Sequence, residues 1–150
     1  MTLARRTFLK STIAAALGTA MLPPSVMADW PKIAFEARTV EEALMALFEN
    51  PEVEKSDQIK IKAPDIAENG AIVPIEVTTD FYHVESIVII AEKNPVPLIA
   101  QFNFTEKAKG WVKTRIKMAE TSPVVAVVKA NGKLYVARRE IQVSEGGCIS

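Results

Sequence analysis

The most reactive side chain in this sequence belongs to Cys148, the only cysteine, which stands two residues before the C-terminus. A cysteine thiolate is a strong nucleophile, and it forms S–S bonds that are stable but exchangeable. Gly146 and Gly147 precede it, and glycine adopts backbone conformations that other residues avoid. When extended, the six residues from 145 to 150 can span about 20 Å. We therefore expect residues 145–150 to form a flexible arm that holds the thiol outside the folded domain.

The lack of a second cysteine limits what Cys148 can do. An internal disulfide is impossible, so the thiol must be free, modified, or joined to another molecule. A catalytic pair with His83 would need a fixed distance between sulfur and imidazole, which a flexible arm does not hold. A frayed tail with an incidental thiol is a further interpretation. The pattern favours a carrier of a covalently attached group over a nucleophilic enzyme.

The remaining polar residues indicate no catalytic or metal site. His83 is the only histidine and follows Asp80-Phe81-Tyr82. A blue-copper site needs two histidines and a cysteine, so that type of metal centre is excluded. The acidic residues match no recognisable motif for general acid and base catalysis. We therefore predict no metal site and no catalytic residue, and we interpret the folded part as a carrier or a binding surface.

The N-terminus has the features of a twin-arginine export signal. Arg5 and Arg6 are followed by Phe8-Leu9-Lys10 and then by a mildly apolar run over residues 11–22. Val26-Met27-Ala28 places small residues where a signal peptidase requires them. We predict a signal peptide over residues 1–28, export to the periplasm, and no membrane association after the signal is removed. An amphipathic anchor helix is the alternative interpretation.

The composition predicts one domain over residues 29–144. The whole chain has 18 basic and 18 acidic residues, and the predicted signal removes three basic residues and no acid. The mature chain, with 15 basic and 18 acidic residues, is slightly acidic and has no basic surplus that would indicate nucleic-acid binding. Hydrophobic residues make up 49% of the sequence, enough for one core.

One helix and about seven strands are expected. Thr39 and Glu42 have the spacing of a capping box, and apolar residues then recur at helical intervals until Asn50-Pro51, so this amphipathic helix should cover a sheet. Asn69-Gly70 and Asn131-Gly132 predict turns. Strands are expected over residues 59–61, 71–78, 84–91, 98–104, 111–118, 124–128 and 134–143. This order predicts a mostly β fold, an antiparallel immunoglobulin-like β-sandwich with one N-terminal amphipathic helix.

Several segments, taken in order, resemble the SoxY family, the sulfur-carrier subunits of the bacterial thiosulfate-oxidising (Sox) system. The matching segments are residues 61–70 (IKAPDIAENG) with Val73-Pro74, residues 94–98 (NPVPL), residues 114–119 (TRIKMA) and Gly146-Gly147-Cys148. The twin-arginine signal is also similar to that of the family. The resemblance extends from about residue 33 to residue 148.

The resemblance implies that Cys148 is the covalent attachment site for sulfur and that Gly146 and Gly147 belong to a swinging arm. In the family's scheme a c-type cytochrome joins the thiol to thiosulfate, and a hydrolase then releases sulfate. A sulfane dehydrogenase with molybdenum and haem oxidises the remaining sulfur. A SoxZ partner, in a heterodimer or a larger assembly, is implied as well. The chain itself would bind no cofactor and would carry only sulfur adducts on Cys148.

The sequence departs from the family pattern at its end. Ile149-Ser150 stands where the family has two further glycines, and a β-branched isoleucine is wider and stiffer than glycine. A paralogue that serves different partners is compatible with this difference. The competing hypothesis is a secreted immunoglobulin-like interaction module whose Cys148 forms an intermolecular disulfide.

Overall fold

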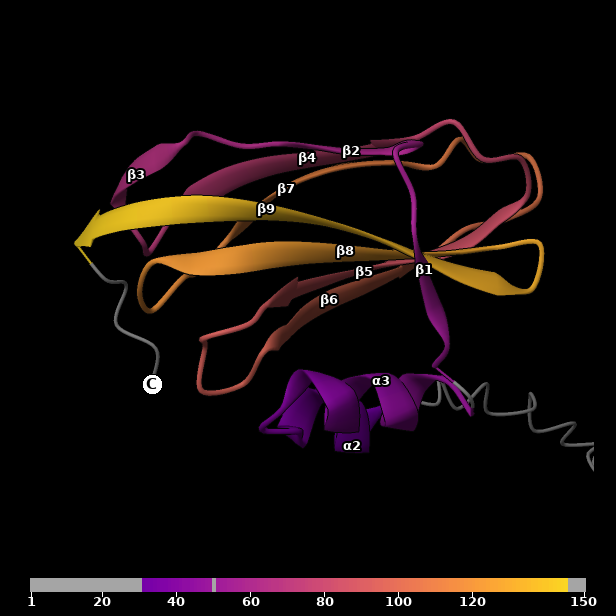
Figure 1. The fold of residues 1–150 in the computed structure, drawn as a ribbon, viewed down its shortest axis with the longest axis horizontal. Helices are drawn as coiled ribbons and strands as arrows, with labels where there is room; N and C mark the ends of the chain where they lie inside the picture. Colours follow the sequence, from indigo (N-terminus) through magenta and orange to yellow (C-terminus); the bar gives the residue numbers. More distant parts are fainter. Residues whose placement is uncertain (1–30, 50, 146–150) are drawn as a thin grey trace, which may run out of the picture. The chain divides into compact units, whose positions relative to one another are not determined.

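The computed structural model describes residues 31–49 and 51–145. The predicted signal peptide over residues 1–28 and the predicted arm residues Gly146, Gly147 and Cys148 lie outside the described residues. Within the described ranges there are two helices, α2 (Lys32–Glu36) and α3 (Val40–Leu47), and nine strands (Figure 1). The strands are β1 (Val53–Lys55), β2 (Ile59–Lys62), β3 (Ile66–Asn69), β4 (Val73–Thr79), β5 (Val84–Ala91), β6 (Leu98–Asn103), β7 (Trp111–Ile116), β8 (Ser122–Ala130) and β9 (Lys133–Glu145).

The strands form two facing sheets (Figure 1). The larger sheet has the order β1-β9-β8-β5-β6, with β3 also paired to β9, and the smaller sheet has the order β2-β4-β7. Neighbouring strands are antiparallel, except that β1 and β3 run parallel to β9. The predicted mostly β sandwich is therefore confirmed. The short strands β1 and β3, which sequence patterns did not indicate, extend the larger sheet along β9.

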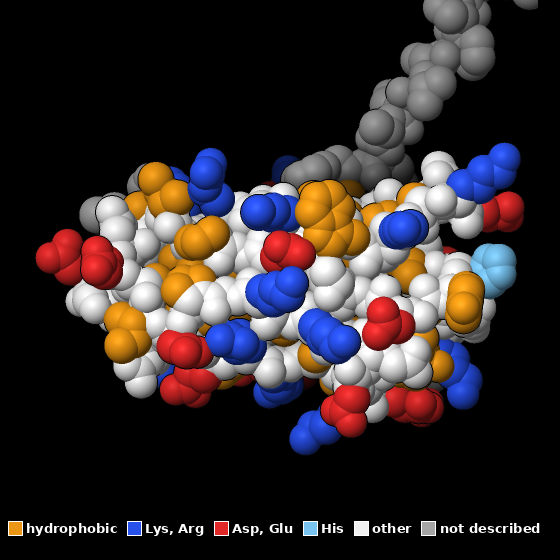
Figure 2. Space-filling view, turned by 90° about the horizontal axis from the view of Figure 1, so that it is seen from above, with side chains coloured by type: hydrophobic (Ala, Val, Ile, Leu, Met, Phe, Trp, Pro, Cys, Tyr) orange, Lys and Arg blue, Asp and Glu red, His pale blue; other side chains and the backbone are white. Residues whose placement is uncertain are grey.

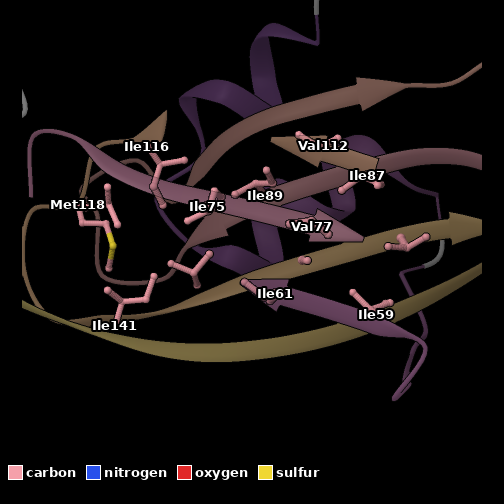
Figure 3. Packing of buried hydrophobic residues seen from close by; sticks show 14 of the residues in the cluster. Ile59, Ile61, Ile75, Val77, Ile87, Ile89, Val112, Ile116, Met118 and Ile141 are labelled. Atoms are coloured by element: carbon pink, nitrogen blue, oxygen red, sulfur yellow. The ribbon is translucent and has the colours of Figure 1, made fainter. Parts of the chain in front are cut away.

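The central strands β5 and β8 are buried on both faces. In β5, Ile87 and Ile89 contribute to the core between the two sheets, whereas Val88 and Ile90 contribute to a second core under the helices. Figure 3 shows the first core, where side chains such as Ile75 and Ile89 approach one another from opposite sheets. Burial of each such side chain contributes about 1.5–3 kcal/mol. The unbroken apolar run in β5 thus belongs to a strand covered on both sides.

The helices cover the face of the larger sheet that points away from the smaller one (Figure 1). Thr39 Oγ1 accepts the N–H of Glu42 at 3.1 Å, and the Glu42 carboxylate accepts the N–H of Arg38 at 3.1 Å. The predicted cap is present, with its return bond to Arg38 rather than to Thr39. Ala43 and Leu44 of α3 are buried against the sheet, so the prediction that this apolar stripe covers a sheet is confirmed. Helix α2 was not predicted.

The turn between β8 and β9 is held by a carboxylate from β5. Asn131 and Gly132 have positive φ angles of 52° and 74°, as expected of an Asn-Gly hairpin turn. Glu85 accepts the N–H of Gly132 at 2.8 Å and pairs with Lys129 Nζ at 2.8 Å. The hydrogen bond from Lys129, aided by that from Gly132, lowers the pKa of Glu85. This carboxylate therefore stabilises the turn in its ionised form.

Candidate functional site at the end of strand β9

The sequence-predicted site residues Gly146, Gly147 and Cys148 follow directly after Glu145, the last residue of β9. They lie outside the described residues, and the described part of the candidate site is the end of β9. We call the contacts that hold residues 142–145 the β9 anchor. It comprises Asp65, Gly70 and Thr121, which form hydrogen bonds with these residues, and Met118, which forms a hydrogen bond with Gly70.

Strand β9 continues beyond the strand that pairs with it over most of its length. The pairing with β8 ends where Ser122 faces Ile141, and from there β3 runs parallel to β9. The N–H of Gln142 donates to the carbonyl of Asp65 at 2.9 Å. On the other side, the N–H of Val143 donates to Thr121 Oγ1 at 2.9 Å. A side-chain hydroxyl thus replaces the ladder bond that β8 no longer supplies.

Gly70 joins three separate segments in the β9 anchor. Its N–H donates to the carbonyl of Glu145 at 2.7 Å, and its carbonyl accepts the N–H of Met118 at 2.8 Å. Gly70 is buried, as is the side chain of Met118. The turn that contains Gly70 is closed by Asn69 Oδ1, which accepts the N–H of Ala71 at 2.8 Å. The last carbonyl of β9 is therefore fixed to the domain.

The loop that supplies Met118 and Thr121 is held by Asn94, a buried side chain with 5% exposure. Asn94 Nδ2 donates to the carbonyl of Lys117 at 2.9 Å, and Asn94 Oδ1 accepts the N–H of Ala119 at 2.9 Å. An amide that both donates and accepts can hold a loop from two sides. Asn94 thus positions residues 117–119, next to Thr121, through which the loop contacts β9.

An ion pair connects β9 to the segment between β2 and β3. Arg139 Nη2 lies 2.7 Å from Asp65 Oδ1, and Arg139 Nη1 donates to the carbonyl of Ile61 at 3.3 Å. Among the described residues, Arg139 Nε is buried without a hydrogen-bond partner. Because Asp65 also accepts the N–H of Gln142 through its carbonyl, one residue contacts β9 at two positions.

Segments far apart in the sequence therefore meet at the end of β9. Residues 61–70, residues 94–98 and residues 114–119, which carry the family resemblance, supply Gly70, Asn94 and Met118. Reasoning from chemistry alone missed these residues, because hydrogen bonds that hold a loop require no reactive side chain. The Asn69-Gly70 turn was the one local signal that pointed to this region.

His83 lies at the other end of the sheet. It directly precedes β5 and has a positive φ of 53°. The next residue, Val84, pairs with Ala130, which is the last residue of β8, whereas Ser122 is the first. It lines a shallow cavity of about 240 Å³ with Phe104 and Asn131. Within residues 31–49 and 51–145, no three His, Cys, Asp or Glu side chains are grouped so that they could hold a metal ion. The described helices include none long and apolar enough to span a membrane.

Comparisons with known proteins place the chain in a family and match its fold. The family model described as sulfur oxidation protein SoxY matches residues 44–148. The structure of the sulfur carrier protein SoxY from Chlorobium limicola f thiosulfatophilum is 41% identical, with a TM-score of 0.65, over 70% of this chain and 96% of that chain.

A superoxide reductase (neelaredoxin) from Ignicoccus hospitalis shares the fold alone. It is 20% identical, with a TM-score of 0.51, over 57% of this chain and 80% of that chain. A search of curated proteins gave no match. The family match covers most of the chain, and the Chlorobium protein is related over nearly its entire length. This chain belongs to the SoxY family.

Proposed function

We propose that this chain is a covalent sulfur carrier, with Cys148 as the attachment site and residues 146–150 as a flexible arm that starts after Glu145, the last residue of β9. Family membership and the 41% identity to a sulfur carrier protein support the role. The observation that carries the proposal is the β9 anchor, because Glu145 is tied to Gly70 and Cys148 follows only three residues later. A fixed origin followed by two glycines suits a thiol that must reach other proteins while its own domain stays folded.

The proposed chemistry uses one side chain of this protein. In loading, the sulfur of Cys148 forms an S–S bond with the outer sulfur of thiosulfate, and two electrons pass to a c-type cytochrome partner. A hydrolase then adds water, releases sulfate and leaves a persulfide on Cys148. A sulfane dehydrogenase then takes six electrons from the outer sulfur onto its own molybdenum and haem groups, and three oxygen atoms from water convert that sulfur to a sulfonate on Cys148. A second hydrolysis breaks the S–S bond, releases sulfate and restores the thiol. The cysteine suits this cycle because its S–S bonds are stable but exchangeable.

The proposed setting is the periplasm, reached through the predicted signal over residues 1–28. There the chain would pair with a SoxZ-like subunit in a heterodimer or a larger assembly. The chain would be a non-catalytic subunit that presents its cargo to partner enzymes. Ile149-Ser150, in place of two glycines, would favour partners with a wider entrance than a Gly-Gly end requires.

The test is the intact mass of the protein purified from cells grown on thiosulfate, measured with and without a reductant. The expected result is a series of sulfur-containing additions that are absent from Cys148→Ser. The matched control is Ser144→Cys/Cys148→Ser, which keeps one thiol but moves it onto β9 within the β9 anchor. This control should react with a maleimide and should carry no enzyme-dependent sulfur.

Two outcomes would contradict the proposal. A reducible dimer as the sole modified species would favour the interaction module with an intermolecular disulfide. Normal sulfur loading of Gly146→Val/Gly147→Val would show that the glycines do not act as an arm, since two branched residues should slow enzymatic loading by at least about tenfold, or ~1.4 kcal/mol of barrier.

A further inference from the structure

The outer face of the smaller sheet carries an ordered group of cations around an exposed tryptophan. Pairing across β2, β4 and β7 places Lys60, Thr78 and Trp111 in one row and Lys62, Glu76 and Lys113 in the next. A third row holds Pro74 and Arg115. We call Lys60, Lys62, Trp111, Lys113 and Arg115 the basic face.

The orientation of these side chains follows from the strand pattern. The intervening residues Ile61, Ile75 and Val112 are buried in the core between the sheets. Because alternate side chains of a strand point to opposite sides of the sheet, the basic face points away from that core. Figure 2 looks onto this side of the molecule and shows Lys and Arg side chains around exposed hydrophobic surface.

The positive charge of the basic face is only partly neutralised. Glu76 accepts a hydrogen bond from Trp111 Nε1 at 3.1 Å and lies 3.8 Å from Lys62 Nζ. Lys60 lies 3.9 Å from Asp80 at the edge of the sheet, where both side chains are exposed. Among the described residues, Lys113 and Arg115 form no ion pair. The basic face therefore keeps a positive excess in a chain whose overall charge is zero.

The basic face also offers an apolar contact. The side chain of Trp111 is 54% exposed, and its indole is oriented by the hydrogen bond to Glu76. Beside it, Lys62, Pro64, Pro74 and Lys113 line a shallow cavity of about 300 Å³. An exposed, oriented tryptophan next to a hollow with apolar walls is typical of a contact site, because tryptophan contributes much binding energy at protein interfaces.

We propose that the basic face docks a protein partner whose contact surface is acidic and presents an apolar side chain to Trp111. Complementary charge attracts such a partner and orients it on approach. A protein fits better than nucleic acid, because Glu76 stands in the centre of the basic face and the rest of the chain carries an acidic excess. The three strands of the smaller sheet are together roughly 10 Å wide, and the six residues of β7 are roughly 20 Å long. An area of this size suits a small and transient contact.

The basic face extends to the neighbourhood of the β9 anchor. Arg115 lies three residues before Met118, which donates its N–H to Gly70, and Gly70 donates to Glu145. A partner docked on the basic face would therefore lie near the last described residue of β9. The docking proposal rests on the charges, the strand register and the exposed Trp111, so it does not depend on the chemistry proposed for Cys148.

The probe is a synthetic 14-residue peptide of Asp and Glu with one central Phe. Binding is measured by the fluorescence of Trp111 in a Trp30→Phe background, since these are the two tryptophans. Lys113→Glu/Arg115→Glu should weaken binding by at least about tenfold, and binding should fall as salt screens the charges. The matched control Lys55→Glu/Lys93→Glu reverses two exposed charges outside the basic face and should bind like the parent.

Four outcomes would overturn the proposal. They are no binding at millimolar peptide, an equal loss of affinity in the control, and tighter binding of a DNA duplex or of anionic phospholipid vesicles than of the peptide. Absence of binding would show that the basic face is no binding site, and an equal loss in the control would show that overall charge alone attracts the peptide. Tighter binding of DNA or of vesicles would show that the basic face binds a nucleic acid or a membrane and not a protein. Thermal melting checks that each variant is folded, and Lys113→Gln/Arg115→Gln substitutes for the charge reversal if that variant unfolds.

Discussion

Asn94→Ala is expected to loosen the β9 anchor from a distance. The substitution removes both hydrogen bonds of the Asn94 amide and leaves the carbonyl of Lys117 and the N–H of Ala119 without these partners. An unsatisfied buried polar group costs about 1–3 kcal/mol, and access of water to the exposed Lys117 and the half-buried Ala119 reduces the sum, so we expect a loss of about 2–3 kcal/mol. The melting temperature should fall by about 6–12 °C for a domain of this size.

The assay is urea denaturation, combined with amide hydrogen exchange. Exchange should accelerate at Met118 and Val143, whose N–H groups donate to Gly70 and to Thr121 Oγ1. The matched control is Asn103→Ala, at an exposed position, which should change stability by less than ~0.5 kcal/mol. If Asn94→Ala lost no more unfolding free energy than this control, or if the amide of Val143 stayed protected from hydrogen exchange, Asn94 would not position the loop.

Three further substitutions test other parts of the fold. Thr39→Ala should cost about 1 kcal/mol in thermal unfolding, because the N-cap of α3 loses its acceptor; an unchanged stability would argue against the cap. Gly110→Ala should cost about 1–3 kcal/mol, since its Cβ would overlap Thr79 Cγ2 and Val84 Cγ2, and a neutral result would show that these side chains shift easily. The hydrogen bond from Lys129 lowers the pKa of Glu85 in the folded protein from its usual value of 4.5. The parent protein should therefore be more stable than Glu85→Gln above pH 4.5, and this difference in unfolding free energy should disappear as the pH falls through the lowered pKa. A difference that persists at acidic pH would refute this linkage.

Sequence patterns predicted the elements whose local signals agree with their burial. Thr39 and Glu42 marked the start of α3, Asn131-Gly132 marked a hairpin, and alternating apolar residues marked the strands that face the core. Each of these signals is local, so it can be read without knowledge of the fold. The two-layered arrangement was predicted from the order of about seven short strands, and the two cores on either side of β5 agree with it.

The elements that were missed depend on partners distant in the sequence. All three residues of β1 are exposed, and in β3 only Ala67 is buried, so neither strand shows an alternating pattern. Both strands form because β9 offers free hydrogen-bonding groups beside them. Asn94 was invisible for the same reason, since a buried asparagine cannot be told from a loop asparagine until Lys117 and Ala119 are placed around it.

Strand β9 also determines how the domain responds to a pulling force. It has 13 residues and pairs with β8, β1 and β3. Ladder bonds lie across the strand, so tension applied to Glu145 along the strand axis loads many of them at once in shear. Peeling from one end would break them one at a time at lower force. In the carrier role proposed above, this resistance would let the arm be withdrawn from another protein's cleft under tension while the domain behind it remains folded.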